Sequence, residues 1–428
     1  MIRQRWKIIQ LLSACLLFVA GVPSAKAEDG VDVLTLAEAR RRAFAKNWDL
    51  LAAKSDVDAA TAQRIVAKEF PNPTLSFSTQ KVNVDDHPSG APGANGLWQR
   101  NYDTIVAVNQ LFEIGGKRRS RKESAVAGFN GAKARFLDAK RTLELAVTRN
   151  YIAALLAEEN KKILQASAAS LRKEATIAET RFHAGDISAA DQAQIEIAAS
   201  RREMDADSAA TNAVTARLAV EILLGRENAR GQWQAGDTLE SLAQFTDRPG
   251  ETARGLRPDL MAADAAVKKA EADLKLQRAM RMPDPTISLQ YEHEPQDQPN
   301  TVGLGVSFPL PLWNRNTGAI QSAEAARQQA ELQLAKTKAQ VAAEVTSAEF
   351  AYGDAAARWQ RYTKEILPKS KQVAEAVAFA YRKGGASLLD LLTAERNDND
   401  IRLATAQSLA DRATAAATLL AAKNISTN

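Results

Sequence analysis

Cysteine, histidine and aromatic residues are scarce in this sequence. Its 428 residues include one cysteine and three histidines, and only 6% are aromatic. A single cysteine excludes a disulfide framework, and few aromatic side chains leave little bulk for a compact core. The hydrophobic content of 45% is nevertheless too high for a chain that stays disordered. The composition therefore favours a folded protein without a bulky globular core.

Basic charge is concentrated at the N-terminus. The net charge is +5, but residues 1–27 hold four basic side chains and no acid, and the remainder is close to neutral. The basic charge that would have favoured a nucleic-acid partner therefore lies mostly in this N-terminal segment. The basic segment Met1–Lys7, the apolar run Ile8–Val22 and an A-x-A tripeptide at 25–27 predict a signal peptide that is cleaved before Glu28.

Two alternatives remain for this N-terminal segment. The apolar run could stay as a membrane anchor, although it is short for a spanning helix. The tetrapeptide that ends at Cys15 also matches a bacterial lipobox, so lipidation of Cys15 could replace cleavage after Ala27. With cleavage after Ala27 the mature chain has no cysteine, which suits an oxidising compartment and excludes thiolate chemistry.

Prolines are clustered, and the chain repeats itself. No proline lies between Pro92 and Pro249, which predicts long helices separated by turns and strands. Residues 48–53 match 258–263, residues 71–74 match 283–286, and residues 181–191 match 380–390. A repeat with this period indicates two structural units of one plan.

Each half has the same predicted order of helix, two strands, very long helix, sharp turn and returning helix. We expect helices at 35–69, 117–182 and 187–224 in the first half and at 259–281, 318–382 and 388–422 in the second. A helix of about 65 residues is close to 100 Å long, which exceeds a compact domain. The domain plan is a signal peptide at 1–27, a first repeat at 28–224, an irregular connecting segment with little regular structure at 225–256, and a second repeat at 257–428.

The strands alternate between apolar and small polar residues. The apolar face in the second half is formed by Ile287, Leu289, Val302, Leu304, Val306 and Phe308. Segments of about 9–11 residues with this pattern fit membrane-spanning strands, so we expect this face to contact lipid. A soluble sheet would show the same pattern, but it would need a core partner that the long helices cannot supply. Four strands cannot close a barrel, and open edges are not tolerated in lipid, so three chains would have to supply twelve strands.

On these features the sequence resembles the TolC-like outer-membrane efflux proteins. The likeness rests on the duplicated plan, on the matching segments named above, and on residues 111–118 and 308–316, which look most like the cobalt–zinc–cadmium resistance branch. The resemblance implies a mainly helical fold with a small β part, in which a homotrimer forms a 12-stranded barrel on a periplasmic helical tunnel. It also implies outer-membrane lipid, a periplasmic adaptor and an inner-membrane resistance-nodulation-division pump as partners.

The two glycine-containing turns are the candidate functional site. Gly at a helix end followed by Ser-x-x-Asp predicts a left-handed turn and a capping box. The resemblance implies instead that these turns form the periplasmic tip and gate, with a gate tyrosine at Tyr381. The sequence departs from the family at Ala386, where an arginine is usual, so Arg382 or Lys383 would have to substitute. The residues assigned to the tip are Phe182, Gly185, Ser188, Asp191, Tyr381, Gly384, Ser387 and Asp390.

Nothing in the sequence forms a catalytic or cofactor-binding constellation. His87 and His293 lie near acids in predicted strand-to-strand loops, and His183 lies near the first turn, but solvated polar loops are the favoured interpretation over a metal site. A duct gains nothing from tight binding of its cargo. We therefore expect no enzyme activity, no cofactor and no resident metal. Four acids on the returning helix would attract cations at a pore mouth or simply form a solvated face: Asp390, Glu395, Asp398 and Asp400.

These observations lead to one functional hypothesis and two rivals. We expect a passive exit duct in the outer membrane, with its helices in the periplasm, that exports divalent cations such as cobalt, zinc, cadmium or nickel. The first rival is the same duct with an organic cargo such as drugs. The second is a periplasmic coiled-coil adaptor, which would lack the paired amphipathic strands.

Overall fold

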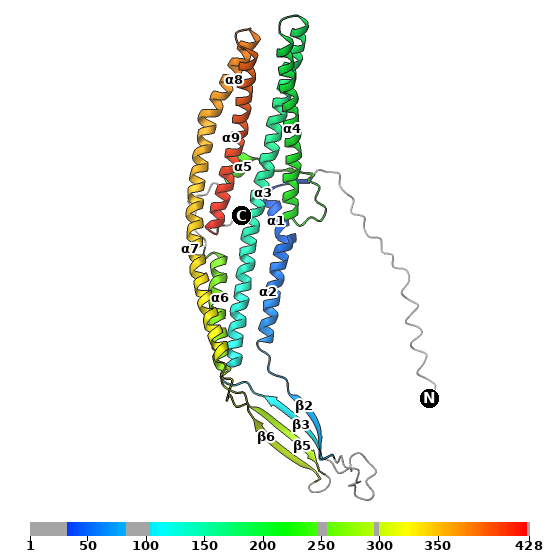
Figure 1. Ribbon diagram of the computed structural model, residues 1–428, viewed down its shortest axis with the longest axis vertical. Helices are drawn as coiled ribbons and strands as arrows, with labels where there is room; N and C mark the ends of the chain where they lie inside the picture. The colour runs from blue at the N-terminus through cyan, green and yellow to red at the C-terminus, as the bar shows by residue number, and fades with distance from the viewer. Residues whose placement is uncertain (1–31, 83–102, 246–254, 295–298, 426–428) are drawn as a thin grey trace, which may run out of the picture.

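A computed structural model describes residues 32–82, 103–245, 255–294 and 299–425. The molecule is elongated, with long helices over most of its length and a small sheet at one end (Figure 1). The predicted signal peptide with Cys15, and the acids and histidine at 85–87, lie outside the described residues. Among the described helices, none has an apolar stretch long enough to cross a membrane.

The first predicted helix is two helices. Helix α1 spans Leu36–Lys46 and α2 spans Trp48–Val66. Asn47 separates them with extended backbone angles, and its side-chain oxygen accepts a hydrogen bond from the amide of Leu50. Its side-chain amide donates to the carbonyl of Leu223, 3.1 Å away. Asn47 therefore ends α1, caps α2 and anchors the break to the end of α4, so the prediction of one continuous helix was wrong.

The long helices of the first half agree with the prediction, whereas the second half is interrupted. Helix α3 is continuous over Lys117–His183, and α4 returns over Ala189–Leu223. In the second half, α6 spans Pro258–Ala279, α7 spans Thr317–Arg361, α8 spans Leu367–Arg382 and α9 spans Leu388–Ala422. A π-helical turn at Tyr362–Ile366 separates α7 from α8. Pro368 explains it, because proline lacks the amide hydrogen and clashes with the carbonyl one turn earlier.

The sheet is antiparallel, in the order β2-β3-β5-β6. Its strands are Thr74–Gln80, Asp103–Leu111, Thr286–His293 and Thr301–Ser307. They contain seven to nine residues, so only β3 reaches the length of about nine to eleven that the sequence suggested. The outer strands β2 and β6 each have one edge without a partner strand among the described residues.

The register gathers most of the large apolar residues of the four strands on one face. One row across the sheet is Phe77, Val106, Tyr291 and Val302, and the next is Leu75, Val108, Leu289 and Leu304. The opposite face carries Ser76, Ala107, Gln290 and Gly303 in one such row. Because side chains alternate along a strand, a slip of one residue would exchange these faces.

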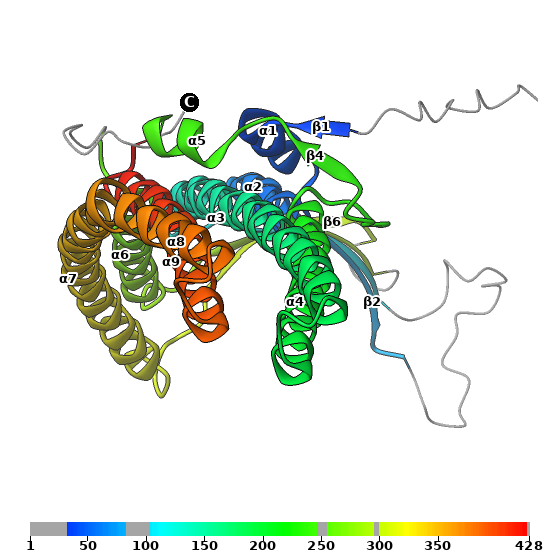
Figure 2. The same ribbon diagram turned by 90° about the horizontal axis from the view of Figure 1, so that it is seen from above.

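A belt of short elements lies against the middle of the helical wall. It consists of β1 (Asp32–Leu34), α1, β4 (Trp233–Ala235) and α5 (Leu239–Phe245), and it lies on the convex side of the wall (Figure 2). Strands β1 and β4 pair in parallel. Trp233 is almost fully buried and stacks on Tyr151 of α3 with ring centroids 5.7 Å apart. The segment 225–256 was expected to be irregular, so this strand and helix correct that prediction.

The junction between α1 and α4 generates the first prediction. Gly225 has φ +71°, and a Cβ there would lie 2.2 Å from the carbonyl oxygen of Lys46. Gly225→Ala should lower the free energy of unfolding by about 3 kcal/mol, because steric overlap adds to backbone strain. Gly255→Ala is the control, since Gly255 has φ +89° but open space around it; its cost should be about 1 kcal/mol. Urea denaturation followed by circular dichroism measures both, and equal midpoints would contradict the contact.

Candidate functional site

The two tips lie at the end of the molecule farthest from the sheet (Figure 1). Gly185 follows α3 with φ +82°, and Gly384 follows α8 with φ +75°. These backbone angles are left-handed, as the sequence predicted for glycine at a helix end. A Cβ at either glycine would meet no atom within 4 Å. A substitution would therefore strain the backbone without displacing a neighbour.

Ser–Asp pairs cap the helices that leave both turns. In the second tip, Ser387 and Asp390 form a complete capping box at the start of α9, with the Asp390 amide 3.2 Å from the Ser387 hydroxyl. Hydrogen bonds from Ser387 hold the pKa of the Asp390 carboxyl below its usual value. In the first tip, the Asp191 amide donates to the Ser188 hydroxyl over 3.1 Å. The capping interpretation of these residues is therefore confirmed.

Tyr381 joins the two tips to each other. Its side chain is buried in a small apolar cluster that includes Ala178 and Ile195 of the first hairpin and Leu388 and Leu391 of the second. The guanidinium carbon of Arg181 lies 5.6 Å from the centroid of the Tyr381 ring, within the range of a cation–π contact. Burial raises the pKa of the Tyr381 hydroxyl, and Arg181 acts in the opposite direction.

The cation that lies beside Tyr381 was not predicted from the sequence. Arg382 and Lys383, the two predicted substitutes for a gate arginine, are exposed, and Lys383 lies 5.9 Å from the ring of Phe379 instead. Arg181 comes from the other hairpin, so no local spacing could reveal it. The repeat does align Phe182 with Tyr381, and this alignment was the available signal that the two tips correspond. Phe182 itself is half-buried and contacts His183.

The four acids on α9 do not form one solvated row. Asp390 and Asp400 are exposed, but Asp398 is buried and accepts hydrogen bonds from Ser370 at 2.9 Å and Arg402 at 2.6 Å. Asp398 therefore contradicts both the pore-mouth and the solvated-face interpretations. Its role is to link α8 to α9.

Glu395 lies in a polar stretch of the contact between the two hairpins. Burial raises the pKa of its carboxyl, the nearby Asp398 and Glu174 add to the effect, and Arg402 and Arg202 oppose it. The residue lines a cavity of about 570 Å³ between α3, α8 and α9. Asn399 lines the same cavity, and its buried side-chain amide has no hydrogen-bond partner within the described parts of the chain. This stretch therefore contains polar groups with few hydrogen-bond partners, and it lies next to the apolar tip cluster.

The acids at the far end of the sheet carry no comparable signal for function. The carboxylates of Asp103, Glu292 and Glu294 lie within 4.8 Å of one another. The ammonium group of Lys81 forms ion pairs with Asp103, at 2.9 Å, and with Glu294. A side-chain cation therefore already neutralises part of this cluster. His293 lies beside Asn300, and His183 is exposed at the end of α3.

The apolar face of the sheet is exposed in the single chain. The exposed fractions of Leu304 and Val302 are 76% and 75%. The other large side chains exposed on this face of β5 and β6 or just after β6 are Ile287, Leu289, Val306 and Phe308. Apolar patches of this kind mark a surface that is covered in the working protein.

The chain belongs to the outer membrane efflux protein family, whose sequence pattern matches residues 39–226 and 250–424. Members of this family are channels and efflux proteins rather than enzymes. The resemblance inferred from the sequence is thereby confirmed.

Individual relatives agree with the heavy-metal branch and with the fold. The cobalt-zinc-cadmium resistance protein CzcC of Cupriavidus metallidurans is 25% identical over 85% of this chain and 83% of its own length. The nickel-cobalt-cadmium resistance protein NccC of Alcaligenes xylosoxydans xylosoxydans is 28% identical over 67% of this chain and 64% of its own. The crystal structure of CusC, which forms a transmembrane channel, superposes with a TM-score of 0.76 at 18% identity and covers 91% of this chain and 92% of that one.

The raised pKa of Glu395 generates a pH prediction. Because the folded protein favours the protonated carboxyl, the contribution of Glu395 is most favourable at low pH. It is lost as pH rises from the ordinary value near 4.5 through the raised pKa. Glu395→Gln should therefore stabilise the protein at pH 7 and have little effect at pH 4.

The control is Glu375→Gln, an exposed carboxylate that lines the same cavity. Denaturant midpoints measured between pH 4 and 8 should differ from wild type in their pH slope only for Glu395→Gln. An identical slope in all three proteins would show that Glu395 is fully solvated.

Proposed function

We propose that the protein is the outer-membrane exit duct of a tripartite, proton-driven efflux system, and that its cargo is divalent metal cations such as cobalt, zinc, cadmium or nickel. The observation that carries the duct is the four-stranded sheet, which has one apolar face and, among the described residues, two edges without a partner strand. This sheet is joined directly to α3, a helix about 100 Å long. The metal cargo is supported by the likeness to CzcC and NccC. Family membership supports placement in the outer membrane.

The working unit of this proposal is a homotrimer. Strands β2 and β6 leave edges that lipid does not tolerate. Three copies joined edge to edge would give a closed barrel of twelve strands, an even number in the usual range. The apolar face of each sheet would then contact lipid, and the helices would extend into the periplasm. The amphipathic strands beside each hairpin argue against a periplasmic adaptor.

The tips are the proposed gate and docking surface. The apolar cluster around Tyr381, with Arg181 beside its ring, holds the two hairpins of one chain together. The exposed residues Arg382, Lys383 and Ser387 would face a periplasmic adaptor, which connects to an inner-membrane resistance-nodulation-division pump. The same duct with an organic cargo remains the second candidate, because the pump selects what enters.

Strand β6 allows the membrane assignment to be tested within one strand. Leu304 lies on the apolar face and Ser307 on the opposite face. Leu304→Arg should impair insertion, because a charge facing lipid at mid-membrane costs about 2–4 kcal/mol. Ser307→Arg should be tolerated, because it would face the lumen. The measurement is the amount of trimer extracted from outer membranes, and equal amounts of both variants would refute this orientation.

The turn at Gly384 tests the tip assignment. Gly384→Val should cost about 1 kcal/mol or more through its left-handed backbone, which the long helices can absorb. Trimer amounts should stay near normal, while growth on cobalt, zinc or cadmium and crosslinking to the adaptor are lost. Gly353→Val is the control, since Gly353 lies inside α7 with open space around it. Full metal resistance in Gly384→Val would exclude the turn as the docking site, and sensitivity to organic compounds alone would favour the second candidate.

A further inference from the structure

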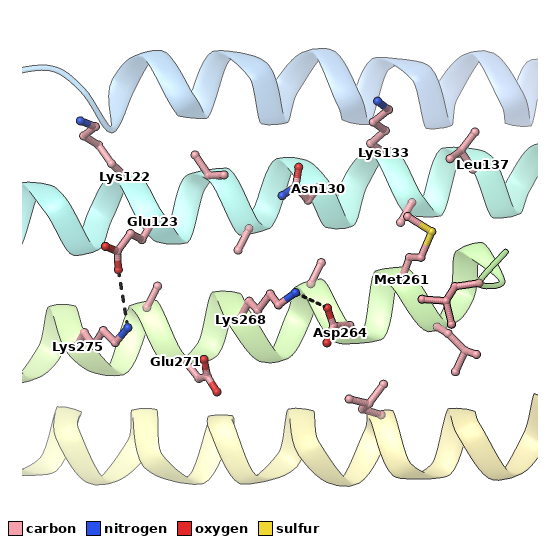
Figure 3. Close-up of a pocket in the computed structure, with 18 of the residues that line it drawn as sticks. Lys122, Glu123, Asn130, Lys133, Leu137, Met261, Asp264, Lys268, Glu271 and Lys275 are labelled. Carbon is pink, nitrogen blue, oxygen red and sulfur yellow. Dashed lines mark ion pairs between the residues drawn. The ribbon is translucent and has the colours of Figure 1, made fainter.

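An apolar groove runs along the helical wall between α3 and α6 (Figure 3). It has a volume of about 1250 Å³ and lies between α3 and α6, with a contribution from α7. Its floor includes Val126, Ala134 and Leu137 of α3 and Met261 and Ala265 of α6. Val126, Leu137 and Met261 are 43%, 38% and 45% exposed, which is high for large apolar side chains.

Farther along α3, helix α1 packs on the same face. Groove residues on α3 recur every three or four positions from Arg119 to Leu137, and Glu144 and Thr148 follow at the same spacing. There α1 covers the stripe, because Arg40 donates to the hydroxyl of Thr148 over 2.9 Å and pairs with Glu144 at 3.7 Å. The fold thus seats a helix on this stripe at the belt. Between the belt and the sheet, Val126 and Leu137 on this stripe are exposed, whereas Ala127 and Ala134 are buried.

Unpaired cations line this groove. Lys268 pairs with Asp264 at 2.6 Å, and Lys275 approaches Glu123 at 3.9 Å. By contrast, three lining lysines have no carboxylate within ion-pair distance in the described parts of the chain: Lys122, Lys133 and Lys338. Figure 3 shows Lys122 and Lys133 on the side of α3 away from α6. Glu271 also lines the groove, so six basic side chains stand against three acidic ones and the rim is net positive.

We propose that this groove binds one helix of a partner protein that carries small apolar residues along one stripe and Asp or Glu on its flanks. The α3 segment from Arg119 to Leu137 is about 27 Å long, so it matches about 18 residues of a helix. Acidic flanks would pair with Lys122, Lys133 and Lys338, so the groove should bind an acidic helix more tightly than a basic one. The inference rests on the proposed function in one respect, because the groove must be open to the periplasm.

The test uses the full-length protein in detergent and two defined 18-residue helical peptides labelled with fluorescein. Both carry Ala and Leu at i, i+3/i+4 and i+7; one has Glu on its flanks and the other has Lys. Fluorescence anisotropy should show the Glu peptide binding at least tenfold more tightly than the Lys peptide. Its affinity should fall as salt rises, because the rim charges are exposed.

Charge reversal makes the test specific to the groove. The double variant Lys122→Glu/Lys133→Glu should invert the preference, so that the Lys peptide binds more tightly. The control Lys336→Glu/Lys369→Glu changes two exposed lysines outside the groove and should leave the preference unchanged. Val126→Trp should weaken both peptides by filling the floor.

Three outcomes would refute the proposal. They are equal binding of both peptides, an unchanged preference in the groove double variant, and loss of peptide binding when phosphatidylglycerol vesicles are added, which would identify the groove as a lipid site. The assay uses neither metal nor adaptor. Its failure would therefore leave the membrane and tip experiments intact, and their failure would not alter the peptide result.

Discussion

Close approach of helices along α3 is the constraint on which the rest of the structure depends. This helix contacts α1, α2, α4, α6 and α9. Small side chains make that possible: a Cβ at Gly131 would lie 3.5 Å from the methyl group of Ala265, and Ala127, Ala132 and Ala134 are buried nearby. Bulkier residues would push the neighbours apart and change the curvature of the wall. This need for small side chains explains why aromatic residues are scarce in the sequence.

The contact between the two hairpins varies along its length. Near the belt it is apolar, through Leu155 and Leu409. At the tip it is again apolar, around Tyr381. The stretch between contains Glu395, Asp398 and Asn399 beside a cavity. Polar groups with incomplete partners stabilise a contact less than apolar packing does. The tip cluster and the belt therefore hold the two hairpins together more firmly than the polar stretch between them.

Features set by local pattern could be predicted from the sequence, and features set by distant contacts could not. The absence of proline predicted the bounds of α3 closely. The alternation of apolar and polar residues predicted the two faces of β5 and β6, because side-chain direction follows strand periodicity. The break at Asn47 was missed because its anchor is the carbonyl of Leu223, far away in sequence. The burial of Asp398 depends on Ser370 of the preceding helix, and the cation near Tyr381 comes from Arg181 of the other hairpin. In each case the deciding partner lies outside any window in which spacing carries information.

The parallel pairing of β1 with β4 has a consequence for how the chain is built. Leu34 and Trp233 are buried together, and the amide of Leu36 donates to the carboxylate of Asp237 across 201 positions of sequence. A chain that crosses a membrane from its N-terminus presents β1 long before β4 has arrived. The belt cannot close until the whole first hairpin has emerged, so contacts of such sequence separation form late. Until then the first strand and α1 expose the apolar side chains that the closed belt buries, so the incomplete chain has an apolar surface that the folded protein lacks.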